Sequence, residues 1–166
     1  APIRPGLLAL LADGRQQLVQ GRMVIRAAGS IGRRDQRDRL ADAMTQTDDS
    51  AVVALADAIG EIDDTNGIEM VARAIRRQVR LVDAVGAAED AAGAIRERQA
   101  RPEGLARLLA AVLRRNGYQA RLAIGVRPDG DTLRTHAWVE LTRGSWGTWR
   151  AVDPLSGQPL DTRWLR

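Results

Sequence analysis

The chain contains a single histidine, His136, within the stretch Thr135 to Glu140. Apolar and polar residues alternate there, which predicts a strand, and a second predicted strand ends at Asp153. A histidine that an aspartate orients is the arrangement that takes the proton from a nucleophile, most often a cysteine. The chain has no cysteine. The predicted pair therefore lacks the reactive group that it would usually serve.

The composition argues against several other kinds of site. The absence of cysteine excludes disulfides and thiolate metal sites, and a single histidine does not favour a histidine-based metal centre, so no metal or other cofactor is expected. All 25 basic residues are arginine, and almost nothing titrates between carboxylates and guanidinium groups, so a net charge of only +4 gives a pI of about 11. Many arginines alternate with acidic residues, as in 33–39, which indicates a solvated helix face. Nucleic-acid binding is therefore not expected.

The length of 166 residues suits one domain with a substantial core and is short for two. No apolar run approaches the roughly 20 residues of a membrane helix, and no charged-then-apolar leader opens the sequence. We therefore expect no membrane contact, and a location either in the cytoplasm or within an assembled particle.

Four amphipathic helices are predicted in the middle of the chain. The first begins at the N-cap cluster Asp48 to Ser50, the second at a capping box that opens with Asn66, and the third covers 89–98. The fourth has Pro102 in its first turn and Gly117 just beyond its end, as helix termini prefer. It is the most hydrophobic helix, and we expect it at the centre of the core.

After Gly117 the hydrophobic period changes from helical to two, which predicts strands. The residues Pro128 to Asp131 predict a turn between the first two strands, and a third strand is predicted from Trp149 to Asp153. On the second strand, one face carries Arg134, His136, Trp138 and Glu140. Helices followed by an antiparallel meander indicate an α+β fold.

Residues 1–48 are harder to interpret. A segment at 18–25 keeps neither period cleanly, glycines and charges follow it, and 37–44 resembles a short helix. We predict that 1–48 form an arm, which either packs on the main domain or docks onto a partner. Residues 49–166 then form the folded domain.

The residues from about Ser50 to Leu160 resemble the transglutaminase-like superfamily, a branch of the papain-like folds with a cysteine nucleophile. The resemblance rests on four segments in the right order: Ala106 to Arg114, Gly117 to Gly125, His136 to Glu140, and Trp149 to Pro154. It implies a fold in which N-terminal helices and a central core helix pack on a small antiparallel sheet.

The resemblance also implies roles for individual residues. The histidine of the family corresponds to His136 and its aspartate to Asp153. The family's cysteine precedes the alanine of the core helix by four residues, and counting back from Ala106 gives Pro102. Glu103 is the only reactive side chain nearby in the chain, and a carboxylate is a poor nucleophile for acyl transfer. No catalytic residue is therefore expected, and His136 and Asp153 form a vestigial dyad.

The first functional hypothesis is a non-catalytic domain that binds a protein or peptide in a cleft lined by His136, Trp138, Trp149 and Asp153. In a variant of this hypothesis, the domain is a structural part of a larger assembly such as a virion or a secretion machine. Each of these residues also has a purely structural interpretation. The histidine would be a hydrogen-bonded structural residue, the aspartate a turn residue, and the tryptophans core fillers in a chain without phenylalanine.

The second hypothesis is an active enzyme of the same fold. It would be a cysteine acyl-transferase or peptidase whose cysteine near residues 100–102 has been replaced in this chain. Alternatively, His136 and Asp153 would activate a water molecule directly. Binding of nucleic acid through arginine is a third hypothesis, and it predicts an affinity that falls steeply with added salt.

Overall fold

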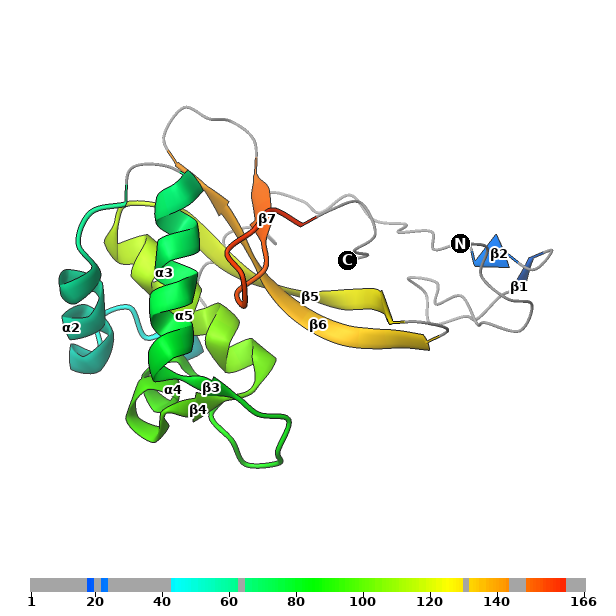
Figure 1. Cartoon of the computed structure of the whole chain (residues 1–166), viewed down its shortest axis with the longest axis horizontal. Coiled ribbons are helices and arrows are strands. Elements are labelled where there is room, and N and C mark those ends of the chain that lie inside the picture. The colour runs from blue at the N-terminus through cyan, green and yellow to red at the C-terminus, as the bar shows by residue number, and fades with distance from the viewer. Residues whose placement is uncertain are drawn as a thin grey trace.

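The computed structural model describes residues 18–19, 22–23, 43–62, 65–129, 132–143 and 149–160. Helices lie on one side of the domain and pack against a three-stranded antiparallel sheet, in the order β5–β6–β7 (Figure 1). This is the α+β architecture that the succession of helices and strands predicts. None of the helices in the described part of the chain is long and apolar enough to cross a membrane.

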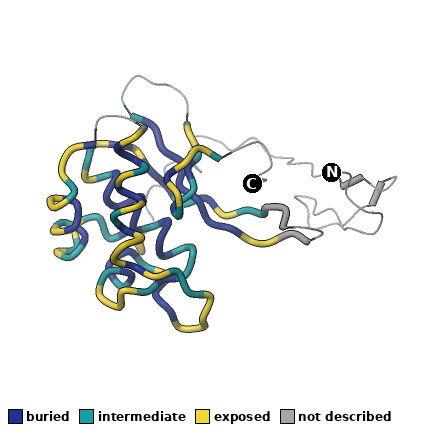
Figure 2. Tube along the Cα trace, in the orientation of Figure 1, coloured by how far each residue is buried: buried dark blue, intermediate teal, exposed yellow. Residues whose placement is uncertain are grey.

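Helix α5 (Pro102–Arg115) is the central element of the core. Nine of the ten residues from Gly104 to Leu113 are buried, and Arg107 is the one exception. The side chains of the sheet and of the other helices complete this core, and Figure 2 shows the buried residues gathered there. Pro102 occupies the first turn, where its missing N–H costs nothing. Gly117 follows the helix end with φ 80°, the conformation that glycine adopts readily.

Helices α2 (Ser50–Ile59) and α4 (Ala91–Glu97) begin at aspartate N-caps. Asp49 accepts a hydrogen bond from the N–H of Ala51 at 2.9 Å, and Asp90 accepts one from the N–H of Gly93 at 2.8 Å. The guanidinium of Arg96 contacts the Asp49 carboxylate at 2.6 Å and lowers the pKa of that group. The N-cap predicted for α2 is thus confirmed.

Helix α3 (Thr65–Gln78) departs from the prediction at its start. The helix already includes Thr65, so Asn66 lies inside the first turn and the capping box predicted there is wrong. The apolar stripe of this helix is buried as its spacing predicts: Ile68, Val71, Ala72 and Ile75 have almost no exposed surface.

The sheet consists of β5 (Gln119–Asp129), β6 (Thr132–Thr142) and β7 (Arg150–Val152). β5 extends through Pro128 and Asp129, so the turn predicted at 128–131 is wrong for these two residues, and 130–131 lie outside the described residues. The predicted glycine turn at 144–147 also lies outside them. On β6, Ala137, Val139 and Leu141 pack into the core with α5. The opposite face carries His136, Trp138 and Glu140, which are buried as well.

A two-residue parallel pair, β3 (Arg80–Leu81) with β4 (Gln99–Ala100), was not predicted, because segments this short carry no periodic signal. It brings the end of α3 beside the start of α5. Gly104 of α5 allows a different close approach, that of the segment at Ala88 beside β4: a Cβ atom there would lie 2.5 Å from the carbonyl oxygen of Ala88.

The N-terminal region is described only in part. β1 (Leu18–Val19) and β2 (Arg22–Met23) form an antiparallel pair in the segment that keeps neither period. A 3-10 helix, η1 (Ala43–Thr45), lies at the end of the predicted 37–44 helix, whose first six residues fall outside the described ranges. The side chain of Thr45 is 1% exposed, and Gln46 Oε1 accepts a hydrogen bond from the N–H of Ala92 at 2.9 Å. Residues 43–48 therefore pack on the helices.

Candidate functional site

His136 is fixed by its place in β6. It pairs directly with Gly125 of β5, so no side chain stands directly opposite the imidazole on that strand. The side chain is only 6% exposed. The ring is thus held by the strand and not by a flexible loop.

Asp153 directly follows β7 and is fixed by the turn that it begins. Its Oδ1 atom accepts a hydrogen bond from the N–H of Leu155 at 2.8 Å, and its carbonyl oxygen accepts one from the N–H of Gly157 at 2.7 Å. The same Oδ1 lies 3.6 Å from Nε2 of His136. That distance is longer than a hydrogen bond, but it places the carboxylate oxygen directly beside the imidazole.

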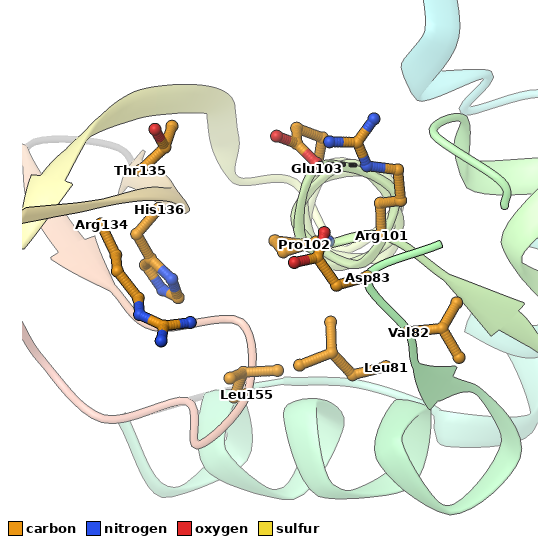
Figure 3. A pocket seen from close by; sticks show the side chains of 10 residues that line it. All are labelled: Leu81, Val82, Asp83, Arg101, Pro102, Glu103, Arg134, Thr135, His136 and Leu155. Carbon is orange, nitrogen blue, oxygen red and sulfur yellow. Dashed lines mark ion pairs between the residues drawn. The ribbon is translucent and has the colours of Figure 1, made fainter. Parts of the chain in front are cut away.

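The third feature is the N-terminus of α5, which faces His136 across a cleft of about 630 Å³ (Figure 3). The cleft is lined by Leu81, Val82, Asp83, Arg101, Pro102, Glu103, Arg134, Thr135, His136 and Leu155. A histidine beside a carboxylate, opposite a helix N-terminus, is the setting in which a nucleophile would be activated by the imidazole and the helix dipole.

The sequence of this part of the chain also matches a known protein family. The sequence model of the transglutaminase-like superfamily matches residues 53–154, which include α5, His136 and Asp153. The chain belongs to the transglutaminase-like superfamily.

A solved structure agrees with this assignment at the level of the fold. It is described as the crystal structure of a TGase, and it superposes with a TM-score of 0.53 at 11% identity. The match covers 64% of this chain and 31% of that chain, so the protein spans about a third of its solved relative. No curated protein matches the sequence.

Within this transglutaminase-like domain, the position opposite the imidazole is taken by Pro102, and the whole chain has no cysteine. Thr135 lines the cleft and is the one hydroxyl residue that does so within the described part of the chain. It cannot serve His136 as a nucleophile, because adjacent strand residues project to opposite faces, and Figure 3 shows its side chain directed away from the imidazole. No group of three or more His, Cys, Asp or Glu residues in the described ranges could hold a metal ion.

The predicted binding residues fall in different places. His136 lines the cleft and Asp153 lies behind it, against the imidazole. Trp138 is 3% exposed, and Trp149 stacks on the guanidinium of Arg121 at 4.1 Å. Neither tryptophan lines the cleft within the described residues, and their part in binding stays a prediction.

Most of the other residues that line the cleft were not predicted from the sequence. Arg134 shares the face of His136 two positions away, so the alternation along the strand contains the signal for it. The segment Leu81 to Asp83 and Leu155 carry no such signal, because they reach the cleft only through the packing of α3, β3 and the turn after β7.

The charges around the cleft balance. Arg101 and Arg134 carry positive charge, and Asp83 and Glu103 carry negative charge. Arg101 also forms a 2.7 Å ion pair with Glu89 and lies 3.8 Å from Glu103. Charged groups therefore surround a floor formed by Leu81, Leu155 and Pro102, and the cleft as a whole has no strong field of either sign.

Proposed function

We propose that this transglutaminase-like domain is non-catalytic and binds a segment of a partner protein in the cleft between α5 and β6. The observation that carries the proposal is the combination of an open cleft with Pro102 at its nucleophile position. A pyrrolidine ring offers neither a nucleophilic atom nor an N–H group to an oxyanion. The acyl-transfer chemistry of a thiol has no starting point here.

The cleft itself supports binding. Its volume of about 630 Å³ lies within the range of sites that hold small ligands or a few peptide residues. Its apolar floor and charged rim offer both buried area and polar contacts. A structural role in an assembly is the related case in which a neighbouring subunit supplies the bound segment permanently.

The test is selection from a displayed library of random dodecapeptides, followed by titration of one synthetic selected peptide. Arg134 is exposed on β6 and lines the cleft, whereas Arg150 is exposed on β7 and does not. We expect Arg134→Glu to weaken binding about tenfold and Arg150→Glu to change it less than about twofold, because only the first alters the cleft. Equal effects of the two variants, or failure to select any peptide, would contradict the proposal.

A second candidate is hydrolysis by a water molecule that His136 and Asp153 activate. The 3.6 Å approach of the carboxylate to the imidazole beside the cleft favours it. It predicts hydrolysis of amide or peptide substrates that His136→Ala abolishes. If the unaltered protein hydrolyses these substrates no faster than His136→Ala does, this candidate is excluded.

The remaining candidate is a cysteine enzyme whose nucleophile has been replaced in this chain. A cysteine codon at positions 100–102 of the encoding gene would support it, and any other codons there would exclude it.

A further inference from the structure

We infer that the cleft binds its peptide by strand addition, with the peptide main chain hydrogen-bonded to the open edge of β3. This inference rests on the proposed function and specifies how the partner segment is held. It also specifies the class of ligand: an extended peptide with an uncharged, apolar residue at the floor of the cleft.

The hydrogen bonds of β3 identify its open edge. The N–H of Arg80 donates to the carbonyl of Arg98 at 2.9 Å, and the N–H of Val82 donates to the carbonyl of Ala100 at 3.0 Å. These groups point toward β4. Successive N–H and C=O groups of a strand point to opposite sides, so those of Leu81 point away from β4. The main chain of Asp83, which comes next on that side, has no main-chain hydrogen bond within the described residues.

The other side of β4 is already occupied. Ala88 forms a parallel bridge with Ala100, and the N–H of Arg101 donates to the carbonyl of Ala88 at 3.0 Å. The small sheet therefore runs from Ala88 through β4 to β3 and ends there. In the described part of the chain, β3 is an edge to which one more strand could add.

This edge coincides with the cleft. The segment Leu81 to Asp83 lines one side of the cleft, and Figure 3 shows the Leu81 side chain directed toward Leu155, with which it forms the floor. A peptide paired with β3 would direct every second side chain toward this floor, since side chains alternate along a strand. Main-chain bonds would supply affinity, and the floor would select one side chain.

The charges of the lining select the kind of residue. Arg101 and Arg134 are offset by Asp83 and Glu103, so a strongly charged ligand would meet like charges as well as opposite ones. A nucleic acid would require an excess of positive charge along its path, which this cleft lacks. A neutral peptide with an apolar side chain matches both the floor and the balanced rim.

The experiment uses the full chain and a synthetic peptide selected from the dodecapeptide library. Each peptide N–H is replaced in turn by N-methyl, and the affinities are measured. We expect methylation to weaken binding about tenfold only at the one or two peptide positions, two residues apart, whose N–H groups face the carbonyl groups of Leu81 and Asp83. Methylation at the position between them should have little effect. Single-stranded DNA at low salt serves as the competing ligand class, and we expect it not to displace the peptide.

Two variants test the protein side of the same bonds. Asp83→Pro removes both the carboxylate and the main-chain N–H, whereas Asp83→Ala removes the carboxylate alone. We expect Asp83→Pro to bind the peptide about five- to tenfold more weakly than Asp83→Ala, with unchanged thermal unfolding.

The outcomes separate the two proposals. Loss of binding in Arg134→Glu without such position-specific losses in the methylation series would retain the proposed function and overturn strand addition. Equal binding by the two Asp83 variants would also overturn strand addition. Displacement of the peptide by DNA would overturn the ligand class, and a library that yields no cleft-binding peptide would overturn both proposals.

Discussion

At the scale of single residues, His136 and Asp153 lie next to each other beside the cleft, and their role as a vestigial dyad stays a prediction. The carboxylate oxygen lies 3.6 Å from the imidazole nitrogen, and the turn after β7 fixes that carboxylate through Leu155. The residue opposite them is Pro102, which starts α5 and has no reactive atom. The two residues therefore face a helix start that offers them no nucleophile.

This interpretation predicts that a thiol placed at residue 102 becomes reactive. In Pro102→Cys, the helix N-terminus and the nearby imidazole should lower the thiol pKa. We expect iodoacetamide to alkylate it at pH 6 about tenfold faster than the thiol of Val85→Cys, which lies on a fully exposed loop. The measurement is the rate of mass increase. Adding His136→Ala should remove most of the difference, and equal rates in Pro102→Cys and Val85→Cys would contradict the assignment of the site.

Arg121 and Glu140 form a second pair, which is structural. Both Nε and Nη2 of the arginine lie 2.7 Å from one carboxylate oxygen, and the two side chains are 4% and 10% exposed. Removing one member leaves a buried charge without compensation.

We expect Arg121→Met alone to lower the free energy of unfolding by about 3–5 kcal/mol, as measured by urea denaturation. The double variant Arg121→Met/Glu140→Leu should recover much of that loss, because it removes both charges. A double variant less stable than the single one would show that the pair contributes net stability.

At the scale of elements, the turn after β7 links the sheet to α3. Gly157 has φ 74°, and a Cβ atom there would lie 2.6 Å from the Cα of Glu69 on α3. Its N–H donates to the carbonyl of Asp153 at 2.7 Å. The close contact with the helix thus fixes the turn that holds the carboxylate beside His136.

Gly157→Ala should therefore be more damaging than an alanine at another glycine with positive φ. Gly117 has φ 80° and nothing within 4 Å of the corresponding Cβ position, which makes it a matched control. We expect Gly117→Ala to cost about 1–2 kcal/mol from backbone conformation alone. Gly157→Ala should cost a further 1–3 kcal/mol or so from the clash. Thermal or urea unfolding measures the loss of stability in both variants. Equal losses would show that α3 moves away from the added methyl group without destabilising the fold.

At the scale of the whole molecule, residues 43–48 pack on the helices of the domain. Thr45 is buried, Gln46 caps an N–H in the first turn of α4, and Asp48 lies 3.6 Å from Arg115. These contacts lie on the arm side of the predicted boundary at 48 and 49, which stays a prediction. The arm's role in docking stays a prediction.

Two truncated chains test this boundary. Residues 43–166 keep Thr45 and Gln46, whereas 49–166 lose both. We expect the shorter chain to be less stable by about 1–3 kcal/mol. The N–H of Ala92 loses its part-buried acceptor, and the helices lose the packing that the buried Thr45 contributes. The free energy of unfolding measures the difference. Equal stability of the two truncated chains would place the boundary at 49 after all.

The sequence by itself determined the secondary structure around the site and the family. The apolar stripe of α5, Pro102 and Gly117 at its ends, and the alternation around His136 are local signals, and each depends on residues close together in the chain. They were enough to place the imidazole on a strand and the aspartate at the end of the next. The assignment of Pro102 to the nucleophile position came from the resemblance to the superfamily. The absence of a thiol follows from the composition alone.

Only the tertiary structure decided what surrounds these residues. Periodicity tells which face of an element is buried but not which element covers it. The lining segment from Leu81 to Asp83 and the floor at Leu155 therefore had no signal, and neither did the pairing of β3 with β4. These contacts join segments far apart in the chain. Their geometry depends on packing across the core, which puts His136 and Pro102 on opposite sides of one cleft with Asp153 behind the histidine.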